Sequence, residues 1–193
     1  MTVSEGDVLS AELAAYRATF RDNRVIADQI TAGLTVEAFN WRPAPDRWSI
    51  AQCVVHLNVS GDLYAARMEA AIRKARADGM VGSGPFQYGP VSRWMLRAVD
   101  PANARKLKSP GKFVPSTTAN YVVRHVLDAF HQAGARWERC LTDANGLDLA
   151  RVKVRSPALP LMHFSLGTLF AIQAAHETRH LLQAQAVFDM HAC

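Results

Sequence analysis

The segment AIQAAHETRHLLQAQAV, residues 171–187, places two histidines four residues apart within a helical apolar pattern. Residues four apart lie on one face of an α-helix, with Cβ atoms about 5–6 Å apart, so His176 and His180 can point at a single ion. Leu169 and Val187 share that face, and the histidines therefore interrupt an interior stripe. Because burying two imidazoles without partners costs free energy, the pattern predicts metal ligands. Interior histidines hydrogen-bonded to carboxylates are the alternative.

The same letters match H-E-x-x-H, the signature of zinc proteases. Such an enzyme needs a third ligand after the motif. In one arrangement a glycine and a histidine follow at fixed spacing, but those positions are Gln183 and Ala186 in this chain. Other zinc proteases use a glutamate well downstream, whereas only thirteen residues follow His180 and none of them is a glutamate. The segment therefore does not predict a protease.

Apolar periodicity predicts four long helices. The first ends around Gly33 and is followed by a short turn that Thr35 caps. The second covers about residues 50–78. It begins with Ser49 and Gln52, whose S-x-x-Q spacing is that of a capping box.

The second half of the chain continues the helical pattern. A short helix is expected near residues 91–99, a third long helix at about residues 118–143, and an extended piece at residues 150–155. Ser165 then caps the fourth long helix, which reaches about Met190. Strand signals are otherwise nearly absent, so the pattern predicts an all-α four-helix bundle.

The lengths of the connections predict the order of the helices. A modest loop joins the first two long helices and makes them antiparallel neighbours. A much longer crossover between helices two and three lets those two run parallel, which gives an up-down-down-up order. The balance of 49% hydrophobic and 20% charged residues is that of a globular protein. We expect residues 1–193 to form a single domain.

Composition also indicates which partners the protein binds and in which compartment of the cell it is found. The chain starts without the features of a signal peptide, and its longest helical apolar run is too short to span a membrane. Cys53, Cys140 and Cys193 are odd in number, which favours reduced thiols in the cytoplasm. The net charge of +5 includes a basic stretch at residues 105–113, but no aromatic stacking series accompanies it. Neither nucleic acid nor membrane is an expected partner, whereas an anionic small molecule fits the basic stretch.

His56 is the candidate third ligand. It stands in WSIAQCVVHL, residues 48–57, seven positions after Ser49 and roughly 10 Å along the second long helix. His180 lies about ten residues, or roughly 15 Å, before the end of the last helix. If these two helices are antiparallel, the three histidines reach a similar level.

Together, WSIAQCVVHL and HETRHLLQA (residues 176–184) resemble the DinB/YfiT-like superfamily of metal-binding four-helix bundles. KFVPS and GLDLARVKVRSP, which precede the third and fourth long helices, are similar to its DinB_2 group. The resemblance implies an up-down-down-up bundle that holds one divalent metal ion through His56, His176 and His180. Zinc and nickel fit three imidazoles, as does iron.

The resemblance also implies roles around the metal. Gln183 matches a glutamine that follows the second motif and would line the pocket or orient a ligand. Glu177 would act as a general base on a metal-activated water, orient a ligand, or face the next helix. Helical spacing adds two candidates: Ser60 and Tyr64, one and two turns after His56, are expected to line the cavity. Cys53, three residues before His56, is more typical of a core residue than of a ligand.

Three histidines leave a coordination position open, as in catalytic metal sites. Several proteins that this chain resembles are thiol-dependent S-transferases or isomerases. The favoured interpretation is therefore metal-assisted addition of a low-molecular-weight thiol to a small electrophile, a detoxification reaction. A metal-dependent hydrolase and a non-catalytic metal- or ligand-binding bundle are the alternatives. The expected partner is a small-molecule substrate, and a homodimer is common among such proteins.

Overall fold

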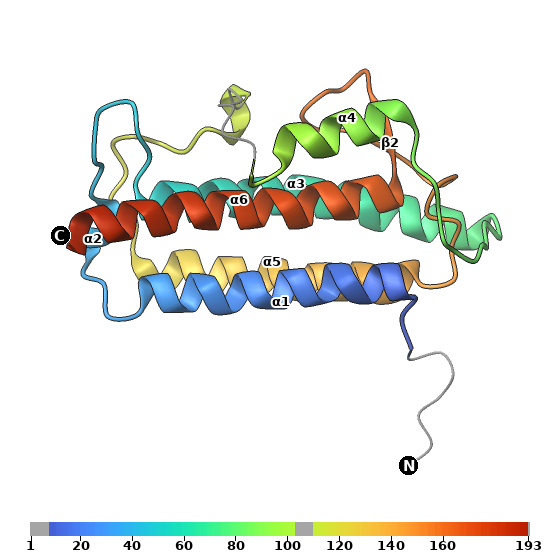
Figure 1. Cartoon of the computed structure of the whole chain (residues 1–193), viewed down its shortest axis with the longest axis horizontal. Coiled ribbons are helices and arrows are strands. Elements are labelled where there is room, and N and C mark those ends of the chain that lie inside the picture. Colours follow the sequence, from blue (N-terminus) through green and yellow to red (C-terminus); the bar gives the residue numbers. More distant parts are fainter. Residues whose placement is uncertain (1–7, 103–109, 193) are drawn as a thin grey trace, which may run out of the picture.

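The structure, a computed structural model, describes residues 8–102 and 110–192, which are mostly helical (Figure 1). Residues 105–109 of the basic stretch and Cys193 lie outside the described residues. The elements are α1 (Ala11–Thr31), α2 (Val36–Asn40), α3 (Ile50–Ala77), α4 (Pro90–Val99), the 3-10 turn η2 (Gly111–Phe113), α5 (Val123–Ala144), β1 (Lys153–Arg155), β2 (His163–Ser165) and α6 (Leu166–Ala192).

The predicted helix starts are confirmed by their caps. The Thr35 side chain accepts a hydrogen bond from the backbone N–H of Ala38 at the start of α2. At the start of α3, Ser49 and Gln52 form both hydrogen bonds of a capping box. The Ser165 hydroxyl accepts from the backbone N–H of Thr168 in the first turn of α6. Local hydrogen bonding thus determines where these three helices begin.

Two features differ from the sequence prediction. Helix α5 begins at Val123, five residues later than expected. The reason is Asn40, whose side chain accepts from the Tyr121 backbone N–H and donates to the Tyr121 carbonyl, which keeps this residue out of the helix. Strand β2 was also not predicted. It pairs antiparallel with β1, with Val154 opposite Phe164.

The four long helices pack along one another. Helix α1 contacts α5 and α6, and α3 contacts the same two helices. Helix α4 lies against α6, on the opposite side of it from α1 and α5 in the view of Figure 1. Helix α4, η2 and the paired strands β1 and β2 therefore cover one face of the α3–α6 pair. This arrangement has the form of a helical bundle with an added cover on one side.

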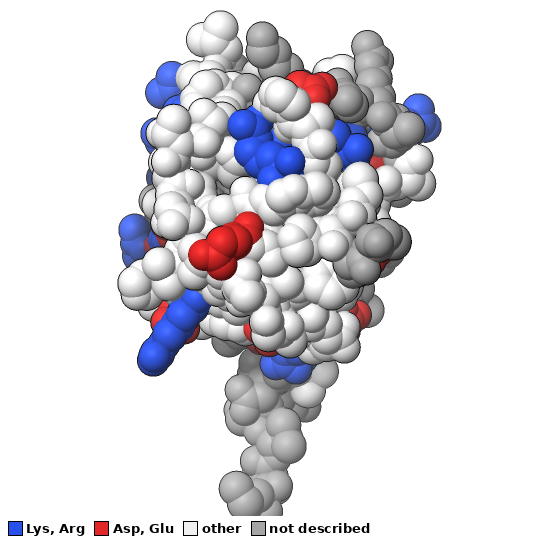
Figure 2. Space-filling model, turned by 90° about the vertical axis from the view of Figure 1, so that its left-hand side faces the viewer, with Lys and Arg blue, Asp and Glu red and all other residues white. Residues whose placement is uncertain are grey.

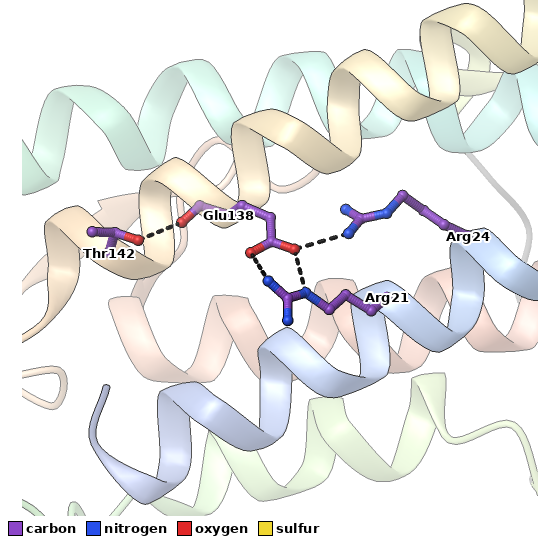
Figure 3. Close-up of polar contacts among 4 residues, drawn as sticks. All are labelled: Arg21, Arg24, Glu138 and Thr142. Atoms are coloured by element: carbon purple, nitrogen blue, oxygen red, sulfur yellow. Dashed lines mark hydrogen bonds and ion pairs between the residues drawn. The ribbon is translucent and has the colours of Figure 1, made fainter. Parts of the chain in front are cut away.

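An ion-pair cluster joins α1 to α5 (Figure 3). The Glu138 carboxylate accepts hydrogen bonds from Arg21 and Arg24, each with a nitrogen 2.8 Å from Oε1. Gly134 makes room for this cluster, because a Cβ atom there would lie 2.7 Å from Nη1 of Arg24. The glycine within α5 therefore has a packing role that offsets its poor helix propensity.

Two apolar clusters fill the bundle, one towards each end. The first includes Met68 and Phe170, and the second includes Phe39 and Leu181. Between them lies a layer of buried polar side chains contributed by α1, α3 and α6: Asn23, His56, Ser60, Gln173 and Glu177. Since buried polar groups cost free energy unless they find partners, this layer is where a binding or catalytic site is expected.

Charge is sparse on the end of the bundle drawn in Figure 2, where basic and acidic side chains are scattered among uncharged ones. The described residues on this face form no continuous basic surface of the kind that follows a nucleic-acid backbone. Within residues 8–102 and 110–192, none of the helices combines the length and apolar character needed to cross a bilayer.

Candidate metal centre

Three histidines from two helices meet in the polar layer. His56 comes from α3, and His176 and His180 come from α6. One ring nitrogen of each lies within 4.8 Å of the others, and we call this group the histidine cluster. The Nε2 atoms of His56 and His176 are 3.0 Å apart. Ligands of one tetrahedral zinc ion are about 3.3 Å apart, so the spacing fits a shared cation.

The outer nitrogens of two rings are held by hydrogen bonds. Nδ1 of His56 donates to the backbone carbonyl of Phe113 at 2.7 Å. Nδ1 of His180 donates to Oε1 of Gln183 at 3.1 Å. In a neutral imidazole, a proton on Nδ1 leaves a lone pair on Nε2, and partners of this kind orient the ligands of metal sites. Gln183 therefore lies where an outer-shell residue is expected.

His176 lacks such a partner. Its Nδ1 is fully buried and has no hydrogen bond among the described residues. Because His56 already presents a lone pair, a direct hydrogen bond between the two Nε2 atoms would place the His176 proton on Nε2 and leave Nδ1 without a donor. A cation that accepts both Nε2 lone pairs removes this constraint. The residues present therefore fit a divalent metal ion.

Burial keeps the histidine cluster neutral. It lowers the pKa of His176 to about 3, with the neighbouring His56 as a smaller cause. Burial likewise lowers the pKa of His56, and it lowers that of His180 well below the usual value. Neutral imidazole is the form that binds metals, so no proton has to be displaced at neutral pH.

The Trp48 side chain forms one wall of the centre. Its ring stacks on His180, with centroids 5.6 Å apart, and lies 5.0 Å from the ring of His56. The residue that precedes the α3 cap thus touches one ligand candidate from each helix. This contact limits the rotation of both rings and shields them from one side.

Glu177 faces away from the histidine cluster, into the bundle. Its Oε1 accepts from the Trp137 indole N–H at 2.9 Å, and its Oε2 lies 3.5 Å from the Asn23 amide nitrogen. Asn23 in turn accepts a hydrogen bond from the hydroxyl of Thr178. The carboxyl group thus ties α6 to α1 and α5 at the turn of α6 that carries His176.

We expect a pH-dependent difference in stability between the metal-free protein and its Glu177→Gln variant. Burial raises the pKa of Glu177 to about 8, from an ordinary value near 4.5. The folded protein then holds a proton that the unfolded chain releases. The bound proton therefore stabilises the folded state relative to the unfolded chain. This stabilisation is complete below pH 4.5 and is lost as the pH rises towards 8.

Glutamine has the same shape and does not titrate. Urea denaturation at about pH 5 and about pH 8 should therefore show the wild type losing stability relative to the variant, by up to about 1.4 kcal/mol per pH unit. The histidines are common to both proteins and cancel in the difference. An unchanged difference would mean that Glu177 is ionised in the fold.

A cavity of about 950 Å³ opens beside the histidine cluster. All three histidines line it, and so do Gln183, Ser60 and Tyr64. Most other lining residues are apolar, and α4, η2 and the β1–β2 region contribute to the cover: Met95, Val99, Phe113, Ala158, Leu159 and Phe164. We call this space the central cavity.

Three further residues with possible ligand atoms lie outside the histidine cluster. Cys53 is fully buried within the second apolar cluster, and burial raises the pKa of its thiol to about 12. His125 and His163 are exposed and lie outside the histidine cluster. Sequence reasoning also missed Gln173, a buried residue that lines the central cavity. Its position one turn before His176 was the available signal.

The comparisons with known proteins agree with this fold. The model of the DinB superfamily (DinB_2) matches residues 19–184. No curated protein matches the chain. Among solved structures, YfiT from Bacillus subtilis, described as a probable metal-dependent hydrolase with an unusual four-helix bundle topology, matches with a TM-score of 0.62. It is 13% identical, and the match covers 100% of this chain and 94% of YfiT.

At this identity the likeness to YfiT shows a shared fold and carries no activity across. The family match is of another kind, because it spans most of the chain and includes the segments that contribute all three histidines of the cluster. The chain therefore belongs to the DinB superfamily.

Proposed function

We propose that this protein is a metal-dependent enzyme that joins a low-molecular-weight thiol to a small electrophile in the central cavity. The observation that carries the proposal is the histidine cluster on the wall of a cavity of about 950 Å³. Pockets for single small molecules measure about 300–1,000 Å³. The central cavity therefore has room for a small thiol and an electrophile side by side.

A bound divalent ion would supply Lewis acidity, which lowers the pKa of a coordinated thiol or water. The chain supplies the rest. His56, His176 and His180 provide three neutral donors, while Phe113 and Gln183 orient two of them. In the transfer, the thiol sulfur forms a bond to the electrophilic carbon, the thiol proton passes to solvent, and the leaving group departs with its electron pair.

The position of Glu177 favours a thiol over water as the nucleophile. Its carboxylate binds Trp137 and Asn23, and it is not among the described residues that line the central cavity. A thiol that has lost its proton needs no base held at the site during the transfer, and a thiolate is a strong nucleophile. Hydrolysis is the second candidate, supported by the description of YfiT, which shares the fold.

The test is an assay of purified protein with chlorodinitrobenzene and with nitrophenyl acetate. Each is run with and without zinc or nickel, and with and without glutathione, mycothiol or bacillithiol. Turnover of chlorodinitrobenzene that needs both thiol and metal supports the proposal. Ester turnover without thiol supports hydrolysis. If neither substrate turns over, the proposal fails and a binding role remains. His176→Ala should abolish either activity, whereas the exposed His125→Ala should leave it unchanged.

The remaining parts of the proposal concern the whole molecule. We propose the up-down-down-up order with a long crossover between α3 and α5, which the run of colours along the helices in Figure 1 supports. We also propose one domain over residues 1–193 and a cytoplasmic location. The free thiols of the buried Cys53 and Cys140 support that location.

A further inference from the structure

We propose that Gln173 and Ser60 form a subsite that binds an uncharged hydrogen-bonding group, such as a carbonyl or amide, on an apolar ligand. This proposal rests on the proposed function in that it describes the electrophile that the enzyme would accept. It concerns a part of the central cavity beyond the histidine cluster. We call the two residues the polar subsite.

Gln173 is the first part of the argument. Its side chain is only 2% exposed and lines the central cavity. Its amide has no hydrogen bond to another described residue and is not among the fully enclosed polar groups without a partner, so what accessible surface it keeps faces the central cavity. An amide offers two donors and an acceptor, and a buried amide without partners costs free energy. A ligand in the central cavity is the partner that this amide lacks.

Ser60 lies at the same level on the facing helix. It is one turn after His56 on α3, and Gln173 is nearly one turn before His176 on α6. The colours of α3 and α6 run in opposite directions in Figure 1, so both steps lead the same way along the bundle. Since His56 and His176 are in contact, Ser60 and Gln173 lie at a similar level along the bundle, and both line the central cavity. Ser60 is also 2% exposed and lines the central cavity.

The polar groups continue one turn deeper, where the Tyr64 hydroxyl lies 3.3 Å from Oγ of Ser156. Both residues line the central cavity, but their hydroxyls already have each other as partners. Leu169 and Ile172 line the same region, together with Phe164. A ligand there would meet an apolar surface with Gln173 as its main source of unused hydrogen-bonding capacity.

Charge separates the two sides of the histidine cluster. The charged side chains among the described lining residues are Asp46, Arg47 and Arg179. Asp46 and Arg47 precede α3, and Arg179 follows His176, so all three lie on the side away from Gln173. Moving a carboxylate from water to the polar subsite would cost far more than moving a neutral carbonyl. The ligand group at this subsite is therefore uncharged.

The subsite also sets a distance within the ligand. Gln173 is three residues from His176, which corresponds to an axial rise of about 4.5 Å. The hydrogen-bonding group of the electrophile would then sit a few bonds from the carbon that reacts at the histidine cluster. This spacing selects apolar molecules that carry a carbonyl or amide near the reactive carbon.

The test uses two probes with the same phenylpropyl skeleton, 3-phenylpropanamide and propylbenzene, of which only the amide carries hydrogen-bonding groups; each is titrated into the protein and followed by NMR. Gln173→Leu keeps the volume of the side chain and removes its hydrogen bonds. Affinity for the amide should fall about five- to tenfold, because the net free energy of one neutral hydrogen bond corresponds to a factor of about that size. Affinity for propylbenzene should stay unchanged. Gln132→Leu, the same substitution at an exposed position on α5, is the control and should change neither.

A wild-type measurement keeps the proposal falsifiable if the variant does not fold. In metal-free protein, the amide should bind at least about tenfold more tightly than 3-phenylpropanoate. Equal affinities, or equal losses for both probes in Gln173→Leu, would overturn the subsite. Binding is measured separately from turnover, so the outcome is independent of the proposed reaction. If thiol transfer fails while the amide preference holds, the proposed function alone is wrong.

Discussion

The His56→Ala variant is expected to bind Zn²⁺ at least about 100-fold more weakly than the wild type. Replacement of even an outer-shell partner typically costs 10–100-fold in metal affinity, and His56 presents its Nε2 directly to the histidine cluster. The substitution would leave two donors, both on α6. The measurement is a competition titration against a chromophoric zinc chelator.

The matched control for this experiment is His125→Ala on α5. His125 is exposed and lies outside the histidine cluster, so its loss should leave the zinc affinity within the error of the titration. Circular dichroism of the apo proteins separates loss of the ligand from loss of the fold. If apo His56→Ala is folded and binds zinc as tightly as the wild type, the ion does not use α3, and the assignment of the centre is wrong.

The Trp137→Ala variant should lose about 3–5 kcal/mol of unfolding free energy. Trp137 is completely buried, stacks on Phe20 with ring centroids 5.4 Å apart, and donates its indole N–H to Glu177. Removing it leaves a large cavity and takes away the main donor of a buried carboxyl group. Both effects act at the junction of α1, α5 and α6, so the loss should be among the largest for any single side chain.

Trp94→Ala is the control, because it makes the same chemical change on a side chain that is 62% exposed. It should alter the unfolding free energy by no more than about 0.5 kcal/mol. Urea denaturation followed by far-UV circular dichroism avoids the loss of fluorescence that either substitution causes. A further variant, Trp137→Phe, keeps an aromatic ring but removes the hydrogen bond and part of the buried ring, and should cost about 1–3 kcal/mol. Similar losses in Trp137→Ala and Trp94→Ala would contradict the buried network.

Much of the secondary structure was predictable because it depends on residues that are close in the chain. The capping box of Ser49 and Gln52 and the cap at Ser165 act within one helical turn. The start of α5 was not predictable in this way. It depends on Asn40, which lies 81 residues before Tyr121. Strand β2 likewise needs its partner β1 to be recognised as a strand.

In the candidate site, too, some features follow from the local sequence and others only from packing. The spacing of His176 and His180 and the family resemblance predicted that these residues would form a cluster with His56, because a helix places residues four apart on one face. The direction of Glu177 did not follow from its place in the motif. Its partners Trp137 and Asn23 come from two other helices, and only packing brings them to the carboxylate.

The sequence by itself determined where most helices lie, which residues cap them and which three histidines are candidate ligands, since periodicity and hydrogen bonds within a turn are local properties. The tertiary structure alone decided which polar groups have partners. It places Glu177 in a buried network, gives Nδ1 of His56 the carbonyl of Phe113, and leaves the Gln173 amide facing the central cavity. The reason is physical: the cost of a buried polar group depends on what the packing of distant segments puts within hydrogen-bonding reach.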